Sequence, residues 1–412
     1  MTTTTTASTT LEVAAPSESL KRRQSALYFA SFAVMGLLVA ALGPSLEGFA
    51  RQTGVQVSAV SILFTAQFLG LLLGTLSSGR VIDRLPVHPL MAVSSAGIII
   101  MVALLPLPTT LTLLIVAMFL LGLAVGGIGL GGNTALVWVH GHGVGPYMNA
   151  LHFFFGLGAL ISPILVAQTL DRTGSVSIAF WIMAVAMLPL PILYLRTRSP
   201  SPPVAAASDA GGRSQWAPVL LTSILFFLYV GLEIGYSGWL FSYATQLGLA
   251  STITAGYLTS FFWAVFTLGR LVGIPLAARV RPRVLLLADL SGILFFFTLL
   301  ALWPQTPTVL WVATAGLGLS MASFYPALFT LAGRHITLTG KVSSILMAGD
   351  NLGAMIIPLL LGVRFASQGT QMLAPTMLIV TVSAFVFYIA LLALFRRHEP
   401  VADAGGPLTA DG

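Results

Sequence analysis

The sequence predicts an all-α membrane protein whose twelve transmembrane helices form two similar six-helix halves. The 412 residues are 57% hydrophobic and only 8% charged, whereas about a quarter of the residues in a soluble domain are charged. Twelve apolar segments reach the roughly 20 residues that a helix needs to cross a bilayer. One half also matches the other at an offset of 195 residues, which is typical of an internal duplication.

The duplication rests on five pairs of identical residues at this offset. The matched residues are Gly158-Ala159 and Pro163 with Gly353-Ala354 and Pro358, Gly74 with Gly269, and Arg84 with Arg279. Chance matching among the 41 glycines is the alternative explanation. The topology that follows from hydropathy and charge favours the repeat.

The elements follow from hydropathy in chain order. Residues 1–26 are polar and open with a threonine run, so they are expected to be a disordered N-terminus. They are too polar for a signal peptide, so the first apolar segment is expected to stay in the membrane. The expected helices cover residues 27–50, 57–79, 88–107, 110–138, 147–170, 176–195, 217–244, 252–278, 284–303, 308–333, 343–363 and 372–395.

The two halves are expected to be joined by a flexible linker at residues 196–216, which contains Ser-Pro-Ser-Pro-Pro followed by Ala, Gly and Asp. The two halves then cover residues 27–195 and 217–395, and residues 396–412 form a tail. No cysteine occurs, so the chain can form no disulfide.

The basic residues alternate between the two sides of this topology. Fifteen lie on the side of the two termini, and three (Arg51, Arg172 and Arg364) lie on the opposite side. This bias places both termini in the cytoplasm, and a plasma (inner) membrane is the expected location of the chain. The net charge of +7 is spread over alternate loops rather than one face, so no nucleic-acid partner is expected. The lipid bilayer and a small solute are the expected partners of a monomer.

A short motif marks the connection between the second and third segments. Gly79-Arg80-Val81-Ile82-Asp83-Arg84 resembles the G-x-x-x-D-R core of the helix 2–3 loop signature of the major facilitator superfamily. The resemblance implies the major facilitator fold, with Asp83 and Arg84 at a cytoplasmic gate rather than at the solute.

Four further stretches narrow the resemblance. They are Gly131-Gly132-Asn133, residues 149–158 (NALHFFFGLG), residues 233–239 (EIGYSGW) and Gly269-Arg270-Leu271-Val272-Gly273. Together they are similar to the fucose–proton symporter branch, and most of all to its sodium-dependent glucose transporter-like members. The resemblance implies uptake of a monosaccharide or related polyol together with a cation.

The chain departs from that branch in helices four and five. Ile128 and Gly129 stand where the family tends to carry an acidic residue. His152 and Phe155 replace the amides with which fucose symporters bind sugar. Coupling and sugar recognition are therefore open to change here.

Ionisable residues inside apolar segments are costly and usually face a wet cavity or a partner. Glu233 shares a helical face with Tyr236 and other aromatic residues, and an acid between aromatic rings suits a sugar. We expect Glu233, Tyr236 and Trp239 to contact the solute; the alternative is an acid wetted near the outer surface within an aromatic belt.

Helix five presents Asn149 and His152 on one stripe with small residues. We expect both to line the solute cavity together with Asn133 of helix four. The alternatives are a histidine bonded structurally to a neighbouring helix and glycines that serve close helix packing alone.

Four more ionisable residues lie inside the expected helices. Arg270 and Asp350 lie at matching depth, so they are expected to pair as a fixed bridge or as a proton-dependent gate. Glu47, beyond Gly43-Pro44, either binds the coupling cation or contacts outer water and Arg51. Asp289 is expected to reach the cytoplasmic boundary and is left out of the site.

The sequence therefore predicts a secondary transporter, driven by H⁺ or Na⁺, with no enzymatic activity and no cofactor or metal. It contains no Walker-type phosphate loop, and His140 and His142 alone are weak evidence for a metal. The alternative function is proton-coupled export of amphiphilic drugs, for which the many Phe and Met residues and the intramembrane acids are also suitable.

Overall fold

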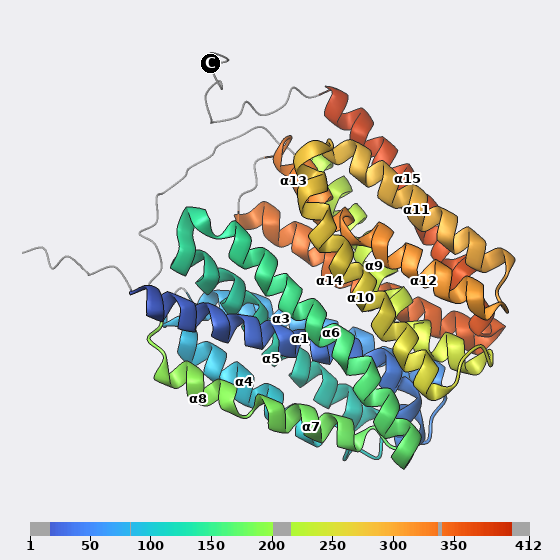
Figure 1. Cartoon of the computed structure of the whole chain (residues 1–412), viewed down its shortest axis with the longest axis horizontal. Coiled ribbons are helices and arrows are strands. Elements are labelled where there is room, and N and C mark those ends of the chain that lie inside the picture. Colours follow the sequence, from blue (N-terminus) through green and yellow to red (C-terminus); the bar gives the residue numbers. More distant parts are fainter. Residues whose placement is uncertain (1–16, 83, 201–215, 337–339, 398–412) are drawn as a thin grey trace, which may run out of the picture.

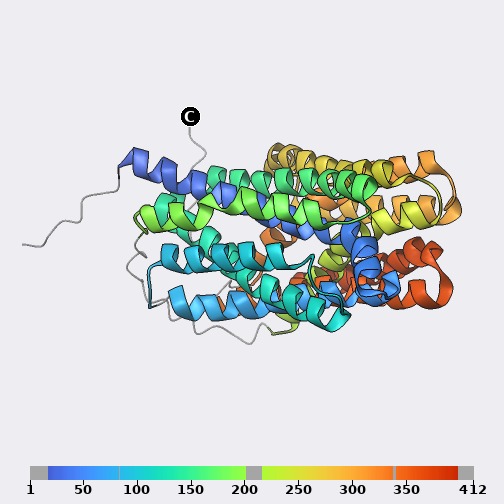
Figure 2. The same cartoon turned by 90° about the horizontal axis from the view of Figure 1, so that it is seen from below.

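The computed structural model describes residues 17–82, 84–200, 216–336 and 340–397. Within these ranges the chain is helical, and twelve stretches are long and apolar enough to cross a membrane, which confirms the predicted number. Figures 1 and 2 show the helices running back and forth along one common direction, with the first six on one side of the molecule and the last six on the other. The residues of the expected central linker and C-terminal tail lie mostly outside the described ranges.

The N-terminal half contains the first six crossings, and its second and sixth crossings are each made of two helices. The elements are α1 (Glu18–Thr53), α2 (Val57–Val60) with α3 (Ile62–Ile82), α4 (Val87–Leu104), α5 (Leu111–His140), η1 (Gly141–Gly143), α6 (Gly145–Thr173), and α7 (Ser177–Met187) with α8 (Pro189–Arg196).

The C-terminal half repeats this plan, with its tenth crossing divided in two. The elements are α9 (Trp216–Gln246), α10 (Thr252–Arg279), α11 (Pro282–Leu302), α12 (Pro307–Ala322) with α13 (Phe324–Gly333), α14 (Gly340–Gln368), η2 (Thr370–Met372) and α15 (Leu373–Arg397).

The first helix begins earlier than the hydropathy of the sequence predicts. It starts at Glu18 instead of residue 27, because Ser17 caps it by accepting a hydrogen bond from the Leu20 amide. Glu18 lies in the first turn, where a negative charge is favoured, and pairs with Lys21. The expected disordered segment therefore ends no later than residue 16, and residues 1–16 lie outside the described part of the chain.

Glycine contacts give the predicted repeat a physical basis. A Cβ on Gly158 of α6 would collide with the Ala33 carbonyl of α1, and a Cβ on Gly353 of α14 would collide with the Phe227 carbonyl of α9. Thus the fifth crossing packs on the first as the eleventh packs on the seventh. Both positions need glycine because two helix backbones touch there.

The two halves meet mainly toward one end of the bundle. We call the end at which α1 begins and α15 ends the terminus side, and the opposite end the far side. Helix α1 packs on α9, α3 on α14 and α6 on α10. In Figure 1 the start of α1 and the end of α15 lie far apart, whereas their other ends approach each other.

Specific contacts close the far side. Gly43 of α1 lies directly against Gly238 of α9, where a Cβ on either residue would meet backbone or the ring of Phe64. The Thr65 hydroxyl donates to the Met355 carbonyl at 3.1 Å across the halves. The molecule is therefore closed at the far side and splayed at the terminus side.

Candidate functional site

Both halves contribute ionisable and polar side chains to the middle of the bundle. We call this group the central cluster. It consists of His152 on α6, Tyr229 and Glu233 on α9, Arg270 on α10, Tyr325 on α13 and Asp350 on α14.

Glu233 is enclosed by its own half. Only 8% of the residue is exposed, and almost every neighbour along this part of α9 is buried. Tyr229, one turn earlier, lies beside the carboxyl group and donates its hydroxyl to the Met321 carbonyl at 2.7 Å. Arg270 is close enough to attract the carboxylate charge. A carboxylate buried among apolar helices requires such a partner.

Arg270 holds the positive charge of the cluster. Its guanidinium carbon lies 4.5 Å from the centre of the Phe266 ring, a cation–π arrangement. Its Nε is buried without a hydrogen-bond partner. The same side chain interacts electrostatically with Glu233 in its own half and with His152 in the other. Arg270 therefore faces both halves at the level where they begin to separate.

The expected ion pair between Arg270 and Asp350 is not formed in this conformation. Among the described residues, the one ion pair between side chains is that of Lys21 with Glu18. Asp350 instead accepts hydrogen bonds from the Tyr325 hydroxyl at 3.1 Å and from Asn351 Nδ2 at 2.8 Å. Tyr325 in turn lies near Arg270 and Glu233, so Asp350 joins the cluster through this tyrosine.

His152 of helix five lies near Arg270 of the other half. His152 and Asn149 are both exposed in this conformation. His152 contacts Phe32 edge-on, with ring centres 6.0 Å apart. Asn133 of α5 is half-buried and donates its amide to the Gly129 carbonyl of its own helix at 2.9 Å. His152 and Asn149 are thus available to a solute, whereas the Asn133 amide nitrogen is engaged locally.

The two aromatic residues expected beside Glu233 pack within the C-terminal half. Tyr236 is fully buried, and its hydroxyl is hydrogen-bonded to Thr314 at 2.8 Å. Trp239 is 1% exposed and donates its indole N–H to the Pro358 carbonyl at 2.9 Å. Their polar atoms therefore already have partners within one half, as buried Tyr and Trp require.

Glu47 lies at the far side, away from the central cluster. The Thr245 hydroxyl of α9 donates to its Oε1 at 2.6 Å, which links the two halves. Beside this bond is an open hollow of about 560 Å³ whose lining includes Glu47, Arg51, Gln56 and Gln246. Of the two residues expected at the opposite gate, Arg84 is exposed at the terminus side, and Asp83 lies outside the described residues.

Asp289 lies buried within the C-terminal half, and its side chain contacts Ser323. The residue is only 7% exposed, and both of its carboxyl oxygens lie 2.9 Å from the hydroxyl of Ser323. Ser323 is the single residue between α12 and α13, and Met321, whose carbonyl Tyr229 binds, lies just before it. We call this interruption between α12 and α13 the helix break. Asp289 and Tyr229 both bind to residues at the helix break, and α13, which follows it, places Tyr325 beside Asp350.

The sequence placed Tyr229 on the helical face of Glu233, but sequence reasoning missed Tyr325 and the helix break between α12 and α13. One signal was present, because Pro326 has no N–H to donate to the carbonyl four residues earlier.

Comparisons with known proteins agree with this architecture. The sequence model of the Major Facilitator Superfamily matches residues 27–358. Sodium-dependent glucose transporter 1A of Mus musculus is 29% identical over 409 residues, which cover 90% of this chain and 95% of the relative. Major facilitator superfamily domain-containing protein 4A of Homo sapiens is 28% identical, covering 90% and 92%.

A solved structure matches over nearly the whole length of the chain. The crystal structure of a mutant of the nucleoside transporter NupG superposes with a TM-score of 0.73 at 14% identity, covering 91% of this chain and all of that one. At this level of identity the match concerns the fold, which it shares with the present chain.

Proposed function

Because the chain belongs to the Major Facilitator Superfamily, we propose that its two halves rock about the central cluster to carry a monosaccharide or related polyol across the membrane. The chain is a transporter rather than an enzyme. The observation that carries the substrate proposal is the central cluster, where Glu233 and Arg270 of one half lie opposite the exposed His152 of the other.

The chemistry of the cluster suits a polyhydroxy solute. The Glu233 carboxylate accepts hydroxyl hydrogen bonds, Arg270 donates them, and His152 does either according to its tautomer. The rings of Phe32 and Phe266 contact His152 and Arg270 and give the cluster an aromatic border. The name of the mouse relative, a sodium-dependent glucose transporter, supports the same substrate class.

Coupling to a cation gradient requires a cation site whose affinity differs between the two conformations. Glu233 and Asp350 are the carboxylates of the cluster, and among the described residues neither forms an ion pair. We propose that H⁺ or Na⁺ binds to one of these carboxylates. When the halves rock, the Arg270 guanidinium would move from one carboxylate toward the other. Glu47 acts separately, as a far-side latch to Thr245.

The positive-inside bias supports an orientation with the terminus side in the cytoplasm. Fifteen basic residues belong to that side and three to the far side. The conformation described here then faces inward, with its outer side closed by the Glu47–Thr245 latch and the Gly43–Gly238 contact. We further propose that the protein acts as a monomer in the plasma membrane.

The test is counterflow in liposomes that contain the purified protein. Vesicles are loaded with one unlabelled solute, and entry of the same labelled solute is followed for hexoses, polyols, nucleosides and cationic dyes. Monosaccharide or polyol counterflow that is abolished in an Arg270→Gln variant is the expected result. Counterflow of dyes or nucleosides alone, with no response to any sugar, would refute the proposed substrate class.

A further inference from the structure

Four of the nine buried side-chain atoms that lack a hydrogen-bond partner in the described part of the chain lie on α9 and α10, two of the helices that meet the N-terminal half. They belong to Ser242, Ser260, Trp263 and Arg270. Such atoms are rare in folded proteins, because an unpaired buried donor loses its hydration without compensation. Arg270 is part of the central cluster, but the other three have no role so far.

Ser260 and Trp263 lie on the face of α10 that packs against α6. Gly256 of this face touches Pro163 and Ala167, and Thr267 fits against Gly156. Ser260 and Trp263 fall between these two contacts at helical spacing, so they point toward the same partner. Trp263 also meets Phe155 of the N-terminal half, with ring centres 6.3 Å apart. Both side chains are therefore sealed between the halves.

Ser242 lies on the corresponding face of α9. It is one turn beyond Gly238, which touches α1 and Phe64, and one turn before Thr245, which binds Glu47. Its exposure is 0%, and those of Ser260 and Trp263 are 4% and 1%. All three unpaired groups thus lie in the portion of the inter-half contact between the central cluster and the far side.

Trp263 is the most informative of the three. A serine hydroxyl can turn back to a carbonyl of its own helix, as Thr259 and Thr267 do on α10. An indole N–H cannot reach such a carbonyl, so Trp263 finds a partner only when another molecule enters the contact between α10 and α6. We call this contact between the halves, together with that of α9 with α1, the seam. The Trp263 ring is bordered by Phe155 from the other half and by Phe262 and Phe266 from its own helix.

We propose that Ser242, Ser260 and Trp263 line the far half of the solute path and hydrogen-bond the hydroxyl groups of the solute when the far side is open. Opening moves α6 away from α10, so the Trp263 N–H becomes free to donate to a solute hydroxyl. Phe155 then no longer covers the Trp263 ring, and the ring can contact the C–H face of a sugar. The inference rests on the proposed function for the chemistry of the solute. The opening of the seam follows from the rocking of the halves and does not depend on which solute is carried.

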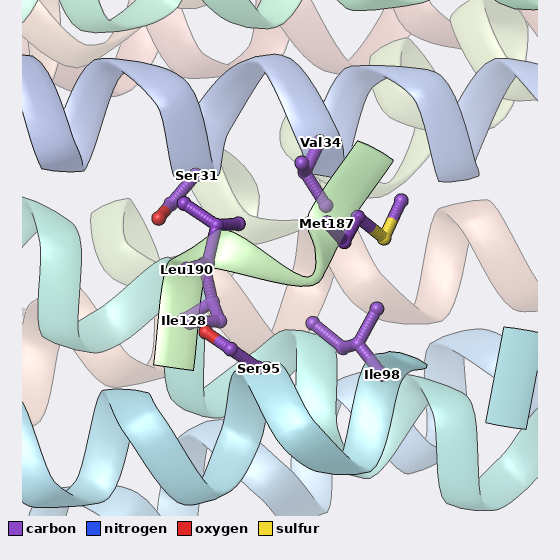
Figure 3. Close-up of a pocket in the computed structure, with 7 residues that line it drawn as sticks. All are labelled: Ser31, Val34, Ser95, Ile98, Ile128, Met187 and Leu190. Atoms are coloured by element: carbon purple, nitrogen blue, oxygen red, sulfur yellow. The ribbon is translucent and has the colours of Figure 1, made fainter. Parts of the chain in front are cut away.

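The absence of cysteine from the chain makes the opening directly measurable. Ser260→Cys and Ser242→Cys variants are exposed to a membrane-impermeant maleimide from the far side of vesicles in which each variant transports. The matched control is Ser31→Cys. Ser31 is fully buried inside the N-terminal half and bonded to Tyr194. It lies beside Ser95 and Leu190 in a packing gap too small for water (Figure 3).

We expect both seam cysteines to be labelled and the Ser31→Cys control to stay unlabelled, because rocking of rigid halves opens the seam but not the interior of one half. Saturating monosaccharide should slow labelling of the Ser260→Cys variant. If neither seam cysteine reacts in vesicles that transport, the inference is overturned while the proposed function stands. Labelling without any monosaccharide transport would instead contradict the proposed function and uphold the opening of the seam.

Solute contact is tested by Trp263→Phe, which keeps an aromatic ring and removes the N–H. Loss of one hydrogen bond should raise the half-saturation concentration for uptake from the far side by about 3- to 10-fold. Trp181→Phe is the control, because that indole donates to Ala103 at the exposed edge of the N-terminal half. Equal half-saturation concentrations for the Trp263→Phe variant and the unmodified protein, with the transported solute of the panel, would overturn the assigned contact.

Discussion

Gly43→Ala should push the protein out of the conformation described here. Gly43 of α1 and Gly238 of α9 touch backbone to backbone, and a Cβ on Gly43 would overlap the Gly238 carbonyl oxygen while lying 2.9 Å from its Cα. Backbone cannot turn aside as the end of a side chain can, so the overlap must be relieved by moving the helices. Because α1 and α9 belong to different halves, separating the halves at the far side removes the overlap altogether.

The size of the effect follows from the cost of overpacking, which is about 1–3 kcal/mol for added methylene-sized groups in a packed interior. The cost applies only while the far side is closed. With RT of about 0.59 kcal/mol, it shifts the ratio of far-open to far-closed molecules by about 5- to 150-fold. Transport should slow, because each cycle must still pass through the penalised conformation.

The assay is maleimide labelling from the far side with Ser61→Cys as reporter. Ser61 is 1% exposed and packs against Gly362 of α14 at the far-side contact, so its labelling rate reports opening there. Gly158→Ala is the matched control, because its overlap with the Ala33 carbonyl lies within one half and persists in both conformations. Gly97→Ala, which makes ordinary contact with Ala124 at 3.4 Å, is the neutral control.

Gly43→Ala should speed labelling, whereas Gly158→Ala should lower the unfolding temperature without changing the labelling rate. If Gly43→Ala leaves labelling at the parental rate and lowers the unfolding temperature as Gly158→Ala does, the halves do not separate at this contact and the reasoning fails.

Three further predictions follow from the cluster, the helix break and the latch. Glu233→Gln should raise the half-saturation concentration by about 10- to 100-fold, the loss expected for a hydrogen bond to a charged group; an unchanged value, equal to that of the exposed-site control Glu18→Gln, would remove Glu233 from the site. Asp289→Asn introduces a buried amide N–H₂ of which the Ser323 hydroxyl can accept only one N–H, and the other is left unpaired at a cost of about 1–3 kcal/mol. Thermal unfolding should therefore occur at lower temperature than for the exposed-site control Asp171→Asn, and equal stabilities would show that the Asp289–Ser323 contact does not hold the break. Glu47→Ala should speed far-side labelling of the Ser61→Cys reporter because Thr245 loses its acceptor in the other half and keeps only carbonyls of its own helix. Glu47→Gln keeps an acceptor for Thr245, so faster labelling in both variants would show that the charge matters rather than the hydrogen bond.

The twelve crossings and the two-half plan were predictable because both depend on properties that the sequence states directly. Segment length and hydropathy fix the crossings, and the matched Gly158 and Gly353 occupy equivalent helix contacts. The early start of α1 was missed because residues 18–26 are polar, and the cap at Ser17 rather than hydropathy determines where the helix begins.

The sequence predicts how far along its helix each candidate residue lies, but not the direction in which its side chain points. Arg270 and Asp350 were placed at matching heights, yet height along two helices does not say whether their side chains face each other. Asp350 faces Tyr325 instead. Likewise Tyr236 shares a helical face with Glu233, but a periodicity cannot tell the centre of the transporter from the interior of one half, where Thr314 holds this tyrosine.

Coupled transport is tested by solute accumulation in liposomes that contain the purified protein, with a sodium gradient and a pH gradient each imposed alone. We predict that labelled monosaccharide accumulates above its equilibrium level under one of the two gradients and that Glu233→Gln abolishes this accumulation. Downhill monosaccharide flux that neither gradient drives uphill would show a facilitator without coupling, and the absence of any monosaccharide flux would contradict the account as a whole.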